Sequence, residues 1–106
     1  MVIYVDIDGT ICNTPKKENN GEWDYHSSTP RQKQIDKINK LYDEGHEIVY
    51  WTARGSSSGL NWKPFTEYQI TNWGCKYKRI EQLKKPSFDL FIDDKSKRIE
   101  EIEWNI

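Results

Sequence analysis

The stretch VIYVDIDGT, residues 2–10, decides the fold class of this chain. Its first half is apolar and rich in β-branched side chains, which is typical of a buried strand, and its second half is the polar loop into which that strand opens. Asp6 and Asp8 are two positions apart, so their side chains project to one side and can converge on one ligand. We therefore expect a strand that delivers two carboxylates at its carboxyl end.

Two later stretches have the same design. The run IVYW at 48–51 leads into Thr52, and an apolar run within 88–92 gives way to Asp93 and Asp94. The carboxyl ends of parallel strands lie at one edge of a sheet, where ligands bind in open α/β folds. The polar groups that follow the three strands are therefore expected to form one site.

A helix is expected between the first two strands. Thr29 is predicted to be its N-cap, with Pro30 at the first helical position and Gln32 completing a capping box. Gly45 is predicted to end it. Its apolar face comprises Ile35, Ile38, Leu41 and Tyr42.

The rest of the chain continues the alternation of strands and helices. A second helix is predicted from Pro64 to Trp73, a short strand within 76–80, and a third helix from about Ser96. This order predicts an α/β sandwich with a mostly parallel sheet. The length of 106 residues suits a single domain, 1–106, in which the long loops 12–28 and 55–63 overhang the site.

Bulk composition restricts the classes of partner. The formal net charge of -1 provides no broad positive field for duplex nucleic acid or an anionic membrane. The apolar start of the chain has no secretory pattern, no run could span a bilayer, and Cys12 and Cys75 match no metal or redox spacing. These features predict a cytoplasmic protein with reduced thiols and a small-molecule partner.

The acids at the strand ends suggest a metal site. Asp6 and Asp8 repel each other, and a hard divalent cation such as Mg²⁺ held by oxygen ligands would relieve that repulsion. Asp93 and Asp94 can add further oxygens. A cation beside a carboxylate nucleophile suits phosphoryl transfer, because the metal cancels charge repulsion between the phosphate and the attacking group.

Groups that could hold a phosphoryl oxygen complete this pattern. The Thr52 hydroxyl and the backbone N–H of Ala53 can donate hydrogen bonds to it, and the Lys85 ammonium can offset its charge. Gly9 allows the backbone to turn sharply after the acids. The pattern as a whole predicts phosphoryl transfer.

Four motifs in this order resemble those of the haloacid dehalogenase superfamily over nearly the whole chain. The stretch DIDGT at 6–10 is similar to motif I, Thr52 within VYWTAR to motif II, Lys85 before a proline to motif III, and the acid pair 93–94 to motif IV. The resemblance implies a Rossmann-like three-layer sandwich with little or no cap, in which residues 12–28 are only a flap.

The resemblance also implies a role for each residue. Asp6 would be phosphorylated, and Asp8 would protonate the leaving group and then activate water. Mg²⁺ would be bound by Asp6, Asp93 and the backbone carbonyl of Asp8, with Asp94 a metal ligand through water or a residue that holds the loop. Thr52 and Lys85 would hold the phosphoryl group.

A narrower similarity involves the segment TARGS at 52–56. It resembles small phosphatases encoded with capsule or surface-polysaccharide genes, which implies a phosphosugar or nucleotide-sugar substrate. Thr52, Ala53, Arg54, Ser56 and Lys85 are the candidate substrate contacts. Members without a cap often close the site with a neighbouring subunit, so a homo-oligomer is expected.

Two other functions use similar residues. A receiver-type signalling module also places acids, a Thr and a Lys around Mg²⁺, but its phospho-acceptor lies on a middle strand. A phosphatase of nucleic-acid ends is supported by Lys16 and Lys17 in the flap and opposed by the near-neutral charge. Lys84 is the other lysine that could share the charge role of Lys85.

Overall fold

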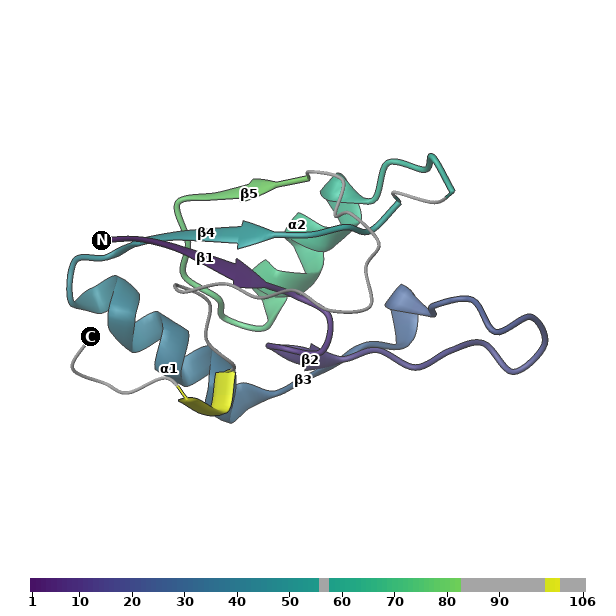
Figure 1. The fold of residues 1–106 in the computed structure, drawn as a ribbon, viewed down its shortest axis with the longest axis horizontal. Helices are drawn as coiled ribbons and strands as arrows, with labels where there is room; N and C mark the ends of the chain where they lie inside the picture. The colour runs from purple at the N-terminus through teal and green to yellow at the C-terminus, as the bar shows by residue number, and fades with distance from the viewer. Residues whose placement is uncertain (56–57, 83–98, 102–106) are drawn as a thin grey trace.

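Three parallel strands form the main sheet of this protein (Figure 1). The computed structural model describes residues 1–55, 58–82 and 99–101. The strands are β1 (Val2–Asp6), β2 (Cys12–Asn13), β3 (Thr29–Pro30), β4 (Glu47–Trp51) and β5 (Arg79–Glu81). The helices are α1 (Gln32–Asp43) and α2 (Lys63–Asn72), with the 3-10 turns η1 (Tyr25–Ser27) and η2 (Ile99–Glu101).

The register of the sheet brings the strand ends together. The order is β1-β4-β5, and Asp6 is the partner of Trp51, which in turn is the partner of Glu81. All three strands therefore end at the same edge. This part of the sequence-based prediction, a small α/β fold with a parallel sheet, is confirmed.

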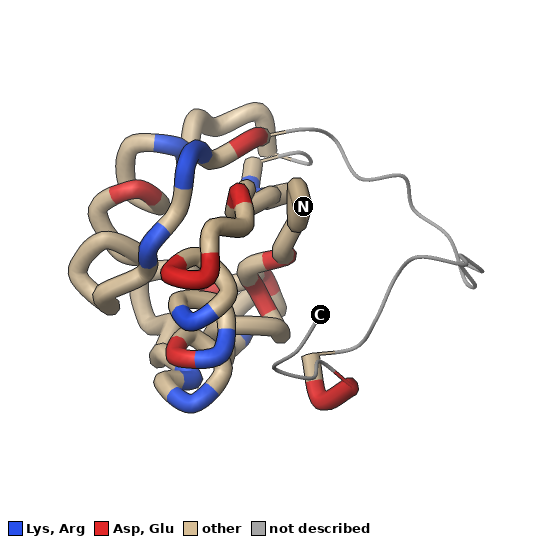
Figure 2. The backbone as a smooth tube through the Cα atoms, turned by 90° about the vertical axis from the view of Figure 1, so that its left-hand side faces the viewer, with Lys and Arg blue, Asp and Glu red and all other residues tan. Residues whose placement is uncertain are grey.

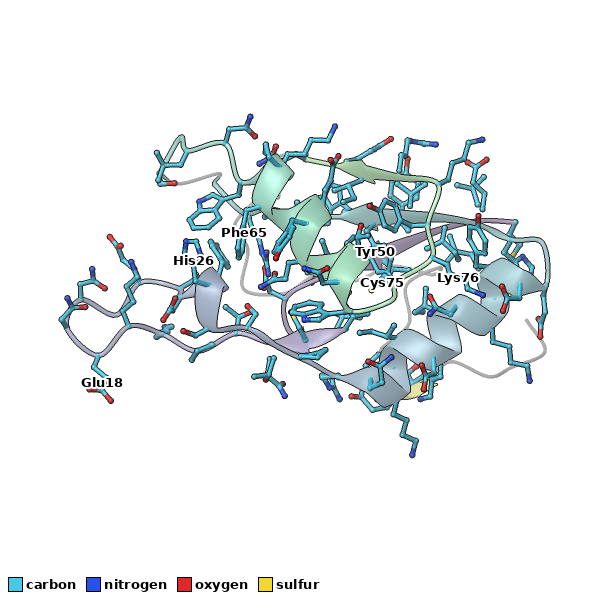
Figure 3. All side chains as sticks on the ribbon, turned by 180° about the vertical axis from the view of Figure 1, so that it is seen from behind. Glu18, His26, Tyr50, Phe65, Cys75 and Lys76 are labelled. Carbon is cyan, nitrogen blue, oxygen red and sulfur yellow. The ribbon has the colours of Figure 1, made fainter. Side chains whose placement is uncertain are left out.

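One face of the sheet is covered by both helices. Ile48 and Tyr50 are two apart on β4 and so face the same side, where they join a buried apolar cluster with α1 and α2. Figure 3 shows the two helices in front of the strands when the molecule is seen from behind. The core of the cluster consists of Val5, Ile7, Ile11, Cys12, Ile35, Ile38, Leu41, Ile48, Tyr50, Ile70, Cys75, Ile80 and Ile99.

The start of α1 differs from the prediction. Thr29 and Pro30 form β3, which pairs antiparallel with β2, and the helix begins at Gln32 after Arg31, which provides no side-chain cap. The predicted capping box was therefore wrong. The physical reason is that Thr29 is already committed to the β ladder opposite Asn13, so it does not adopt the cap position.

Two other predicted elements occur in the structure close to their expected positions. The helix predicted at 64–73 corresponds to α2, displaced by one residue, and the strand predicted within 76–80 corresponds to β5 at 79–81. The strand predicted at 88–92 lies outside the described residues. A helix was predicted from about Ser96; of that segment the structure describes only Ile99–Glu101, which form η2. The second helical layer of a three-layer sandwich therefore stays a prediction.

The segment between β2 and β3 forms an arm that extends from the body (Figure 1). Lys16 pairs with Trp23 in an antiparallel bridge, and the Lys17 N–H donates to the Glu22 carbonyl at 2.7 Å. The arm then returns through η1 to the body. We call this segment, residues 14–28, the flap; it is the structural counterpart of the flap predicted at 12–28.

Among the residues that the structure describes, neither helix is long and apolar enough to cross a membrane.

Candidate functional site

The site is built at the carboxyl edge of the sheet. Asp6 is the last residue of β1, and Asp8 follows it in the turn beyond the strand. Thr52 comes directly after Trp51, the partner of Asp6 on β4. The structure thus places the first acid pair and the predicted motif II threonine on neighbouring strand ends, as the sequence suggested.

A tight turn sets the direction of the backbone after Asp6. The Thr10 and Ile11 N–H groups both donate to the Ile7 carbonyl, at 3.1 and 3.0 Å, and Gly9 adopts φ 84°. Arg31 holds this turn from outside, because its Nη1 donates to the carbonyls of Gly9 and Thr10 at 3.1 and 3.2 Å. The glycine is required by the left-handed backbone and not by lack of space, since an added Cβ would meet nothing within 4 Å.

Asp8 is paired with a buried arginine. The Arg54 Nε donates to Asp8 Oδ2 at 3.0 Å, and Nη2 donates to Oδ1 at 2.9 Å. The Arg54 side chain exposes 0% of its surface, while that of Asp8 exposes 29%. This two-point contact fixes both the position and the plane of the carboxylate.

The remaining face of Arg54 is occupied by α2 and the flap. Its Nη1 donates to Gln69 Oε1 at 2.8 Å and to Thr66 Oγ1 at 3.3 Å, and its Cζ lies 4.7 Å from the centroid of the Tyr25 ring. Such a cation–π contact stabilises a guanidinium that has lost its water. The sequence suggested a direct substrate contact for Arg54, whereas the structure directs its side chain at Asp8.

Asp8 has further partners on its own side of the site. Thr14 Oγ1 donates to Asp8 Oδ1 and is 2.7 Å from Ser28 Oγ, so the two ends of the flap meet at this carboxylate. Cys12 Sγ lies 3.6 Å from the same oxygen. Burial raises the pKa of the Cys12 thiol to about 11, so this thiol is neutral at pH 7 and serves as a small apolar neighbour.

Thr52 is fixed by the backbone around it. Its side chain is buried, its N–H donates to the Glu81 carbonyl at 3.0 Å, and its Oγ1 accepts the Arg54 N–H at 3.0 Å. A hydroxyl that accepts one hydrogen bond can still donate another. Thr52 can therefore offer its O–H to a phosphoryl oxygen at the strand end, and Ala53 lies between the two residues of this turn.

Four rings connect the flap to the start of α2. Trp62 lies 4.9 Å from Tyr25, 5.3 Å from His26 and 5.6 Å from Phe65, measured between ring centroids. His26 and Phe65 are themselves 4.5 Å apart, and Figure 3 labels both. We call Tyr25, His26, Trp62 and Phe65 the aromatic cluster. Because the rings contact one another, the cluster packs the flap against the body.

Sequence reasoning missed Thr14 as a partner of Asp8, and it gave Thr66 and Gln69 no structural role. No pattern marks Thr14, a lone threonine in a polar loop. The spacing of three between Thr66 and Gln69 is a usable signal, since it puts both side chains on one face of α2. That face meets Arg54.

Several predicted site residues lie outside the described residues: Ser56, Lys84, Lys85, Asp93 and Asp94. Within 1–55, 58–82 and 99–101 there is no group of three or more His, Cys, Asp or Glu side chains that could hold a metal ion. The meeting of the two acid pairs therefore stays a prediction.

Comparison with known proteins bears on the fold. No family model matches the chain, and no curated protein matches it. A crystal structure of an MCSG target protein from Vibrio cholerae is similar to it, with a TM-score of 0.74 and 26% sequence identity over 95% of this chain and 86% of that chain. That protein carries no functional name. The chain thus shares a small parallel α/β architecture, consistent with a minimal Rossmann-like fold, with a solved bacterial protein.

Proposed function

We propose that this protein is a Mg²⁺-dependent phosphomonoester hydrolase of the haloacid dehalogenase type, which acts on a small phosphorylated metabolite through an aspartyl-phosphate on Asp6. One observation supports this proposal most. The second acid of the pair, Asp8, is held by a buried guanidinium at the end of β1, beside Thr52 at the end of β4. A carboxylate with a fixed direction next to a second carboxylate is what a two-step transfer requires.

In the first step, a carboxylate oxygen of Asp6 attacks phosphorus. The new bond joins Asp6 to the phosphoryl group, and the bond between phosphorus and the ester oxygen breaks. Asp8, in its protonated form, gives its proton to the departing oxygen, which leaves as an alcohol. The Thr52 O–H donates to a phosphoryl oxygen during this transfer.

In the second step, water releases the phosphate. Asp8, now a carboxylate, takes a proton from the water that attacks the phosphorus of the Asp6 phosphate, and inorganic phosphate leaves as Asp6 is restored. In this proposal, Oδ2 of Asp8 exchanges the proton. Oδ1 accepts from Arg54 and Thr14, while within the described chain Oδ2 accepts only from Arg54 Nε, so Oδ2 retains a lone pair for the proton.

The donor set fits a hard cation. Asp6 would supply a carboxylate at the strand end and Asp8 its backbone carbonyl, as the family resemblance implies, while the side chain of Asp8 bonds to Arg54 and Thr14. Asp93, with Asp94 beside it in sequence, would complete an all-oxygen set of the kind that Mg²⁺ prefers. When bound, the ion would offset charge between the phosphate and Asp6.

The surface favours a small substrate over a nucleic-acid end. Lys and Arg residues are interleaved with Asp and Glu over the described backbone, as Figure 2 shows, and the formal net charge is -1. A nucleic-acid-binding face would require clustered positive charge. Lys16 and Lys17 are accompanied in the flap by Glu18 and Glu22, which reduces their joint field. A phosphosugar or nucleotide-sugar precursor is the substrate class that we favour.

A phosphate-release screen tests this function. Sugar phosphates, nucleotides and 3′- or 5′-phosphorylated oligonucleotides are incubated with the protein, with Mg²⁺ or with EDTA. We expect Mg²⁺-dependent release from the small esters and a loss of at least about 10³-fold in Asp6→Asn, because its amide cannot attack phosphorus. Asp43→Asn is the matched control, since Asp43 pairs with Lys76 on the exposed side of α1.

The outcomes separate the three functions. Release from small esters that Asp6→Asn abolishes and Asp43→Asn retains supports the proposal. Preference for oligonucleotide ends would support a nucleic-acid-end phosphatase in its place. Stable phosphorylation of Asp6 by a phosphodonor, without turnover, would support a receiver-type module.

A further inference from the structure

Gln69 connects the flap to the arginine that holds Asp8. Its Oε1 accepts from Arg54 Nη1 at 2.8 Å, and its Nε2 donates to the backbone carbonyl of Tyr25 at 2.9 Å. The side chain is buried, with 7% of the residue exposed. Both ends of one planar amide are thus used, one toward the site and one toward the flap.

The flap contacts the same guanidinium a second time. The Tyr25 ring lies over Arg54 at 4.7 Å, while the Tyr25 carbonyl is held by Gln69. Displacing Tyr25 would therefore remove a ring from one side of Arg54 and a hydrogen bond from Gln69 at once. The aromatic cluster adds to this coupling, because Trp62 packs against Tyr25 from the start of α2.

We propose that Gln69 is a positioning residue that makes the orientation of Asp8 depend on docking of the flap. This inference rests on the proposed function, in which Asp8 protonates the leaving group. With the flap docked, Gln69 and Tyr25 hold Arg54, and Arg54 holds the carboxylate of Asp8 at two points. With the flap released, Arg54 loses the Tyr25 ring and Gln69 loses the carbonyl that fixes its amide, so the guanidinium is held less firmly and the acid loses its fixed direction.

The consequence depends on the leaving group of the substrate. An alkyl or sugar phosphate requires protonation of its departing oxygen, so its turnover depends on a well-placed Asp8. A nitrophenyl phosphate leaves as a stable phenolate and needs little help from an acid. Docking of the flap should therefore matter more for the turnover of alkyl and sugar esters than for that of nitrophenyl phosphate.

Two variants of Gln69 test this coupling. Gln69→Met removes both hydrogen bonds at similar volume, and Gln69→Glu keeps an acceptor for Arg54 but has no donor for the Tyr25 carbonyl. Gln34→Met is the matched control, because Gln34 is a second buried glutamine, and in the part of the chain that the structure describes its Oε1 has no hydrogen-bond partner. Turnover of a hexose phosphate and of p-nitrophenyl phosphate is measured for each protein.

We expect kcat/KM, which reports the first step, to fall about tenfold or more for the hexose phosphate in both Gln69 variants and to change less than about twofold for the nitrophenyl ester. Gln34→Met should affect the two esters equally. An equal loss on both esters in the Gln69 variants would overturn the positioning role, because it is what general loss of folded protein produces.

A second measurement follows the flap without using activity. Trypsin cleavage after Lys16 and Lys17 is compared with cleavage after Lys40 in α1, by mass spectrometry of the fragments. We expect the ratio to rise at least about threefold in Gln69→Met and Gln69→Glu, and to stay unchanged in Gln34→Met. An unchanged cleavage ratio in the Gln69 variants would overturn the coupling. If the wild type hydrolyses neither ester, only the proposed function is refuted, and the trypsin result still decides whether Gln69 holds the flap.

Discussion

Arg54 holds the carboxylate of Asp8 at two points, with hydrogen bonds of 3.0 and 2.9 Å, from a side chain that exposes none of its own surface. The two residues are 46 positions apart in sequence. The contact exists because the parallel register of β1 and β4 puts their carboxyl ends side by side. It joins the ends of two strands and, through Arg54, the flap and α2.

Replacing Arg54 should reduce both stability and turnover. Arg54→Met removes the guanidinium that pairs with Asp8. Because Asp8 is 29% exposed, we expect a loss near the low end for a broken buried pair, about 3 kcal/mol in the free energy of unfolding. Arg54→Lys keeps the charge but cannot form the two-point contact, so kcat for a sugar phosphate should fall about 10²-fold with less loss of stability. Urea denaturation and phosphate release measure the two effects. Equal turnover in Arg54→Lys and wild type would contradict the role of geometry.

Two glycines with the same backbone conformation should respond differently to alanine. Gly9 and Gly55 both have φ 84°, but an added Cβ at Gly55 would lie 2.1 Å from the Leu60 carbonyl oxygen, whereas at Gly9 it would meet nothing within 4 Å. Gly9→Ala should therefore cost about 1 kcal/mol from the left-handed backbone alone. Gly55→Ala should cost at least about 3 kcal/mol, since backbone must also move. Urea midpoints compare the pair, and similar values for the two variants would contradict the steric argument.

Trp62, in the aromatic cluster, and Trp23, in the outer part of the flap, should contribute differently to stability. Trp62 is at the centre of the aromatic cluster, while Trp23 is 53% exposed and lies under the Lys16 ammonium at 4.9 Å. We expect Trp62→Ala to lower the free energy of unfolding by about 2 kcal/mol and Trp23→Ala to change it by less than about 0.5 kcal/mol. Denaturation curves followed by far-ultraviolet circular dichroism give both values. A larger effect from Trp23 would show that the arm packs differently.

Stability should fall in alkaline solution because of the buried thiols. Burial raises the pKa of Cys12 and of Cys75 from 9.0 to about 11 in the folded protein. Between these values the unfolded chain has lost thiol protons that the folded chain retains, so the free energy of unfolding should decrease as pH rises from about 9 to about 11. The double variant Cys12→Ala/Cys75→Ala should show a shallower decrease. Urea titrations across this pH interval measure the slope, and an identical slope in the variant would exclude the thiols as its source.

The order of elements and the first half of the site follow from local sequence. An apolar β-branched run that breaks off at Asp6 has few alternatives to a buried strand with acids at its end, and the 48–51 run repeats the pattern before Thr52. Both strands occur where predicted and are parallel. A helix between Pro30 and Gly45 was predicted from the spacing of Ile35, Ile38, Leu41 and Tyr42. The structure has it at 32–43 with the first three buried, whereas Tyr42 is 40% exposed and does not belong to the buried face.

Other features depend on contacts that a local pattern does not contain. Thr29 has the chemistry of an N-cap, yet it pairs with Asn13 in a β ladder, because the return of the flap brings the two segments together. Arg54 was expected to contact the substrate and instead pairs with the carboxylate of Asp8, because α2 and the flap remove its access to solvent. The fold decides which of several suitable partners a polar side chain contacts, because it brings only some of them within hydrogen-bond distance.

By itself, then, the amino-acid sequence determined the alternation of strands and helices, the acids at the end of β1 and the threonine at the end of β4, because hydrophobic periodicity and strand-end polarity are properties of neighbouring residues. Only the tertiary structure decided that Asp8 is held by Arg54, that Gln69 links this arginine to the Tyr25 carbonyl, and that Thr14 closes the base of the flap. Those contacts join residues far apart along the chain, and burial makes each polar group take whichever partner the fold brings within reach.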